Sequence, residues 1–213
     1  MSYLPLKRMR AAAGLALCVL ACGSCGDALR QDRSASYLVV DLMEAASGAV
    51  PGQFGMVLAS DVLTYVKRTV GTEQVLVPTV FEDVGRASMH IALKDIGNSN
   101  SATPTPNNDI TINRYRVVYV RADGRNTPGV DVPYPFDGAI TGTISSGRTS
   151  LTFIVVRAQA KEEAPLKALT ASGGAVLIST IAQVTFYGRD QAGHDVSITA
   201  QIGVNFGDWG DPV

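Results

Sequence analysis

At residues 196–206 the sequence reads Val-Ser-Ile-Thr-Ala-Gln-Ile-Gly-Val-Asn-Phe, and every second residue is apolar. Successive side chains of a β-strand point to opposite faces, so this period of two gathers the apolar side chains on one face. They are Val196, Ile198, Ala200, Ile202, Val204 and Phe206. A helix would spread the same residues around its axis. We therefore expect a strand with one buried and one solvated face, as antiparallel sheets allow.

The residues before this strand predict its hairpin partner. The segment 175–187 is rich in β-branched and aromatic residues and is apolar enough to be a central strand. Between the two lies Gly-Arg-Asp-Gln-Ala-Gly-His-Asp at 188–195, a turn-forming composition. The two strands are therefore expected to pair.

Other segments repeat the strand pattern upstream. Further strands are predicted at residues 37–42, 55–58, 74–80, 86–96, 110–121, 139–144 and 151–157. In 110–121 the apolar residues change phase around Asn113-Arg114, which predicts a β-bulge. Only two segments suggest helices: 158–169, interrupted by Pro165, and 60–68.

Seven to nine strands with frequent turns predict an all-β fold, an antiparallel β-sandwich, with a β-barrel as the alternative. Over residues 86–206 this pattern resembles the immunoglobulin-like sandwiches of envelope and surface proteins. The resemblance rests on the strand pattern, because the Cys–Trp–Cys signature of antibody domains is absent. With no internal repeat or second linker, residues 37–213 are expected to form a single sandwich domain.

The first 21 residues have the layout of a secretory signal peptide. Lys7, Arg8 and Arg10 form a positive end, and an apolar run follows from Ala11 to Ala21. This run is shorter than the roughly 20 residues that a transmembrane helix needs. We therefore expect residues 1–21 to direct export and to be removed.

The apolar run ends in Val19-Leu20-Ala21-Cys22, which resembles the lipobox of bacterial lipoproteins. The resemblance implies diacylglyceryl transfer to Cys22, cleavage before it and acylation of the new amino group. Cys22 would then bind membrane lipid, and residues 22–36 would form a lipidated tether. Gly23 and Ser24 follow, which by analogy with enteric bacteria suggests the outer membrane of the cell envelope. The alternative is an ordinary signal peptide cleaved near Ala21.

Composition excludes several classes of function. Apolar residues make up 46% and charged residues 17%, as in a globular protein with a core. Without residues 1–21 the chain has 15 basic against 19 acidic residues, so no nucleic-acid partner is expected. All three cysteines lie within the first 25 residues. The body therefore has no internal disulfide, thiolate metal site or cysteine nucleophile.

No catalytic motif emerges, and we expect a protein that is not an enzyme and uses no cofactor. His90 falls on the polar face of a predicted strand, and His194 lies in a predicted turn. The paired acids Glu82-Asp83 and Glu162-Glu163 are interpreted as solvated faces. No metal-ligand spacing is present, although the segment Gly207–Asp211 could bind calcium weakly if it is not a solvated tail.

Binding functions are expected in the loops. The segment 97–109 is polar, and 122–137 is proline-rich. Tyr134, Phe136 and Trp209 are the candidate recognition residues, with the alternative that they plug one end of the sandwich. The prediction is a non-enzymatic envelope lipoprotein that binds another envelope protein or has a structural role. Glycan or peptidoglycan binding is the alternative.

Overall fold

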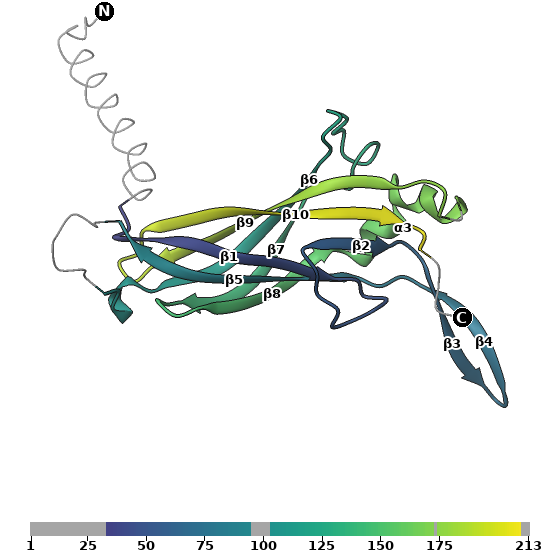
Figure 1. The fold of residues 1–213 in the computed structure, drawn as a ribbon, viewed down its shortest axis with the longest axis horizontal. Coiled ribbons are helices and arrows are strands. Elements are labelled where there is room, and N and C mark those ends of the chain that lie inside the picture. The colour runs from purple at the N-terminus through teal and green to yellow at the C-terminus, as the bar shows by residue number, and fades with distance from the viewer. Residues whose placement is uncertain (1–32, 95–102, 173, 210–213) are drawn as a thin grey trace, which may run out of the picture.

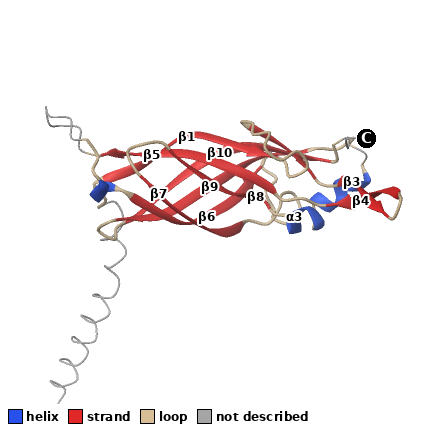
Figure 2. Ribbon diagram, turned by 90° about the horizontal axis from the view of Figure 1, so that it is seen from below, coloured by secondary structure: helices blue, strands red, loops and turns tan. Residues whose placement is uncertain are grey.

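The computed structural model describes residues 33–94, 103–172 and 174–209. Two sheets form an elongated body (Figures 1 and 2). The first has the order β1–β5–β8, with β1 (Ser36–Ala46), β5 (Asp83–Leu93) and β8 (Thr149–Val156). The second has the order β2–β10–β9–β6–β7, with β2 (Val57–Asp61), β10 (Asp195–Gly207), β9 (Ile178–Asp190), β6 (Ile110–Val120) and β7 (Phe136–Ile144). The predicted all-β fold is confirmed.

The core lies between the two sheets and draws on both. Met89 and Phe153 come from the first sheet, and Phe186 and Val204 from the second. An aromatic cluster centres on Tyr115, whose ring centroid lies 5.2 Å from that of Phe153. Such offset and edge-on contacts stabilise a core beyond the area they bury.

The strand β10 has the buried and exposed faces that the alternation of residues 196–206 predicts. Ile202, Val204 and Phe206 of β10 are buried, whereas Val196 and Ile198 nearer the start of the strand are partly buried. One face of β10 therefore packs into the core and the other faces solvent.

Two finer predictions for the second sheet are also confirmed. The strand β9 is central, because it pairs with β10 on one side and with β6 on the other. The register of β6 shifts between Ile112 and Arg114 against both of its neighbours. This is the bulge expected at Asn113-Arg114.

One pairing departs from the antiparallel prediction: β2 runs parallel to β10, with Val57 opposite Gly203. The chain reaches β2 from β1, which belongs to the other sheet. A strand that enters from the opposite sheet is not joined to its neighbour by a hairpin, so nothing forces it to be antiparallel.

Of the two helical predictions, the structure confirms one and contradicts the other. The segment predicted at 158–169 holds α3 (Ala158–Glu162) and the 3-10 helix η2 (Leu166–Ala171), with Pro165 between them. A further 3-10 turn, η1, spans Pro106–Asn108. The helix predicted at 60–68 is wrong, because these residues end β2 and begin β3 (Thr64–Val70). Ser60 and Asp61 pair with β10, and the residues from Thr64 to Arg68 pair with β4, so partners elsewhere in the chain hold this segment extended.

The strand β3 pairs with β4 (Glu73–Thr79) in a separate two-stranded sheet. We call this element, residues Thr64–Thr79, the ribbon. It projects from the body at the end opposite the first described residues (Figure 1). The sequence predicted β4 as a strand but missed β3.

The chain before residue 33 lies outside the described residues, and Cys22 with the signal-peptide prediction falls there. The first strand begins at Ser36, one residue before the predicted start of the domain. Within the described part of the chain, no helix has the length and apolar character to cross a membrane.

Candidate functional site

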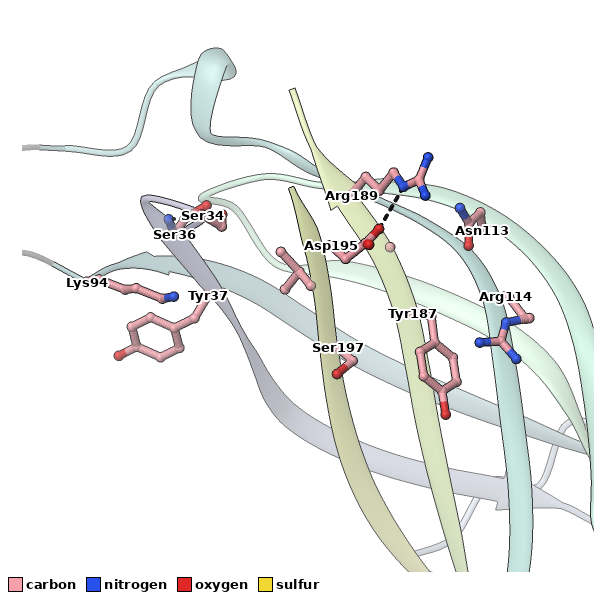
Figure 3. Close-up of a pocket in the computed structure, with 12 residues that line it drawn as sticks. Ser34, Ser36, Tyr37, Lys94, Asn113, Arg114, Tyr187, Arg189, Asp195 and Ser197 are labelled. Carbon is pink, nitrogen blue, oxygen red and sulfur yellow. Dashed lines mark hydrogen bonds and ion pairs between the residues drawn. The ribbon is translucent and has the colours of Figure 1, made fainter. Parts of the chain in front are cut away.

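A groove of about 620 Å³ opens at the end of the sandwich where the described chain begins (Figure 3). We call it the β1-end groove. The first residues of β1 contribute to it, as do the bulged part of β6 and the β9–β10 hairpin. Two strands that are distant in sequence, β1 and β6, thus meet the β9–β10 hairpin at one hollow, a placement that sequence patterns do not reveal.

One side of the groove is built on Tyr187. The Arg114 guanidinium lies over its ring at 4.0 Å, and Arg114 Nη1 also donates to Asp137 Oδ1 at 2.9 Å. The bulge before Arg114 sets the phase of β6 and so brings this side chain beside Tyr187. The Arg114 guanidinium thus places hydrogen-bond donors beside an aromatic ring.

On the other side, Tyr37 and Lys94 lie next to each other (Figure 3). The Tyr37 side chain is 41% exposed. Arg189 and Asp195 form an ion pair of 2.7 Å at the rim. Aromatic rings surrounded by polar groups suit a polar ligand with apolar faces, such as a saccharide.

Both histidines pair with aspartates. His194 donates from its backbone N–H to Asp190 Oδ1 at 2.8 Å, and its Nδ1 lies 2.9 Å from Oδ2, within the β9–β10 turn. Burial alone would raise the pKa of Asp190, but hydrogen bonds from His194 and Ser34 outweigh it and lower that pKa. His90 Nδ1, on β5, lies 3.0 Å from Asp41 Oδ2 on the neighbouring strand β1, and both side chains are partly exposed. Turn and surface pairing account for both histidines.

Tyr134 and Phe136, two of the predicted recognition residues, are placed differently. Phe136 is the first residue of β7 and is 7% exposed, with its ring edge-on to Tyr115 and under the Arg157 guanidinium at 4.5 Å. Tyr134 is 52% exposed and covers Gly129. The structure does not bring the two rings together on a shared exposed surface, because the strand begins at Phe136 and turns that ring inward.

Trp209, the third predicted recognition residue, closes the far end of the second sheet. Its indole Nε1 donates to the Ser60 carbonyl at 3.2 Å, and its backbone N–H donates to Asp61 Oδ1 at 3.1 Å. Trp209 therefore joins the end of β10 to the root of the ribbon. Asp211 of the suggested calcium loop lies outside the described residues, and those that are described hold no cluster of metal-binding side chains.

A buried polar cluster near the root of the ribbon was missed by the sequence analysis. Asp83 Oδ1 accepts from Lys161 Nζ at 2.8 Å and from the Gly48 N–H at 2.9 Å, and Oδ2 accepts from the Ser60 hydroxyl at 2.6 Å. Both ionisable side chains are fully buried. The interpretation of Glu82-Asp83 as a solvated face is therefore wrong for Asp83, although Glu82 is exposed.

Burial raises the pKa of Asp83, against the opposing effect of Lys161 and of the Ser60 and Gly48 donors. The partners lie 78 residues apart in sequence, so no local motif signals the cluster.

Comparison with protein-family models, curated proteins and solved structures finds no match for this chain.

Proposed function

We propose that this protein is a non-enzymatic envelope lipoprotein, held at the outer membrane through acylated Cys22, that binds another envelope protein through the ribbon. The observation that carries the proposal is the ribbon's exposure. In its two strands, which the structure describes in full, Thr64 alone is buried.

The exposed side chains of the ribbon favour a protein ligand. Val70 is 65% exposed, Leu76 51%, Val75 44% and Tyr65 41%. Two-stranded hairpins are marginally stable on their own in water, and open strand edges are templates for pairing. The binding of a partner that covers the ribbon would therefore stabilise it by burying its apolar side chains and pairing an open strand edge.

The occupant we propose is an extended segment of the partner that adds to the ribbon as a third strand. Main-chain hydrogen bonds would supply affinity, and alternate side chains would pack against the exposed apolar residues. The strand β3 carries two basic residues, Lys67 and Arg68, whereas β4 carries one acidic residue, Glu73. The ribbon is thus slightly basic, so the partner segment is expected to carry acidic residues.

The anchor adds to this interaction by confining the domain to the membrane surface. Confinement raises the effective concentration for a partner in the same envelope, so a modest intrinsic affinity suffices.

The test is site-specific photocrosslinking in the native envelope. A photoreactive residue replaces Leu76 on the ribbon or, as the control, exposed Thr152 on β8. We expect one or two proteins to crosslink from position 76 and not from position 152, and to be lost in a Cys22→Ser strain. Equal crosslinking from both positions, or none from position 76, would contradict the proposal.

A second function has one specific observation in its favour, the β1-end groove. Tyr37 and Tyr187 with stacked Arg114 could hold a glycan strand or peptidoglycan. The protein should then co-sediment with isolated cell-wall sacculi, and Tyr187→Ala should abolish this while Tyr134→Ala leaves it intact. Equal retention by the two variants would remove the groove from consideration.

A further inference from the structure

The Asp83–Lys161 pair combines a nucleophile and an acyl carbon in a site closed to water. Both side chains have zero exposure, and Nζ lies 2.8 Å from Oδ1. As an ion pair it is a poor source of stability, because removing two charges from water costs free energy that their attraction only partly returns. The same arrangement also suits the formation of a covalent bond between the two side chains.

The two carboxyl oxygens of Asp83 have different partners. Oδ1 accepts from the Gly48 N–H, a fixed backbone donor of the kind that stabilises a developing oxyanion. Oδ2 accepts from the Ser60 hydroxyl at 2.6 Å, a group able to donate a proton to a departing oxygen. Oδ1 is thus placed to remain as the carbonyl oxygen of an amide, and Oδ2 is placed to leave.

We propose that Lys161 and Asp83 are joined in the mature protein by an intramolecular amide bond between Nζ and Cγ. The reacting form is the neutral pair, in which a proton of the ammonium has passed to the carboxylate. The amine lone pair forms the N–C bond, Oδ1 carries the negative charge of the tetrahedral intermediate, and the Cγ–Oδ2 bond breaks. Oδ2 leaves as water with the carboxyl proton and one amine proton, so nothing is oxidised or reduced.

The site favours this condensation in two ways. Holding the reacting groups together provides effective concentrations of about 10⁵ M or more in well-oriented systems. The dry surroundings also favour neutral species, because burial raises the pKa of Asp83 and the amide carries no charge. The product would connect β5 covalently to α3, the element that follows β8.

The bond has a defined signature in a tryptic digest of the purified full-length protein. Asp83 lies in the peptide 69–86, and cleavage after Arg157 and Lys161 would normally release 158–161. We expect 69–86 linked to 158–167, uncut after Lys161, at the summed mass less one water. Release of 69–86 and 158–161 as separate unmodified peptides, with no linked species, would overturn the proposal.

Two further measurements test whether Lys161 and Asp83 form this bond. In a Lys161→Arg variant, which keeps the positive charge but lacks the reactive amine, the linked species should disappear. Reductive methylation of the denatured wild-type protein provides an independent readout, with Lys167 of the same peptide as the internal control. Lys167 should be methylated and Lys161 should not, whereas methylation of both would overturn the proposal.

Discussion

Replacing Phe136 by alanine tests whether this ring belongs to the core or to a recognition surface. The ring is 7% exposed, and its burial is worth about 1.5–3 kcal/mol. The edge-on contact with Tyr115 adds about 0.5–1.5 kcal/mol, and the Arg157 guanidinium about 1 kcal/mol. Phe136→Ala should therefore lower the free energy of unfolding by about 3–5 kcal/mol, as large-to-small core substitutions do.

Tyr134→Ala is the matched control, because this ring is nearby but 52% exposed. Its loss should cost about 1 kcal/mol or less. Urea unfolding, followed by the fluorescence of Trp209, the single tryptophan of the chain, measures both variants. An unchanged m-value with a shifted midpoint would report stability alone.

In thermal unfolding, Phe136→Ala should lower the Tm by about 10 °C. A loss below about 1 kcal/mol for Phe136→Ala, or equal losses for the two variants, would refute the placement of this ring in the core.

Three further predictions concern other parts of the sandwich. Gly138→Ala should cost about 1–3 kcal/mol, measured by urea unfolding, because its new Cβ would collide with the Tyr115 ring. Tyr119→Phe should cost about 1–3 kcal/mol in the same assay, because the hydroxyl is buried and donates at 2.6 Å to a backbone carbonyl of β8. Because the pKa of Asp190 is lowered in the folded protein, its ionised carboxylate stabilises the fold at pH values above the pKa that it has in the unfolded chain. This stabilisation is lost as the pH falls through the pKa of the folded state. His194→Ala should therefore destabilise the protein at pH 7 by more than at pH 3, and an equal loss at both would exclude this linkage.

Strands whose packing is set by local alternation could be predicted from the sequence. The residues from Val196 to Phe206 carry their own face assignment, and the phase change at Asn113-Arg114 marks a bulge that the register confirms. Period-two patterning is a property of consecutive residues, so it needs no knowledge of the partner strand.

Features that depend on distant partners could not be predicted. Lys161 stands beside Glu162 and Glu163, which suggests a solvated turn, but its partner Asp83 lies in another element. The segment 60–68 carries no clear alternation, and its extended form depends on the pairing of its first residues with β10 and of its last residues with β4. The β1-end groove forms only where β1 and β6 meet the β9–β10 hairpin, so no single stretch of sequence signals it.

The first described residues and the ribbon lie at opposite ends of the body (Figure 1), so the length of the body separates them. The strand β10 has 13 residues, and at about 3.3 Å per residue it spans about 40 Å of the long axis. If the chain is held at Cys22 and stands upright, the ribbon is carried at least this far above the bilayer. A partner lying flat on the same leaflet would pass beneath it. The segment that meets the ribbon would have to stand away from the membrane or belong to a neighbouring layer of the envelope.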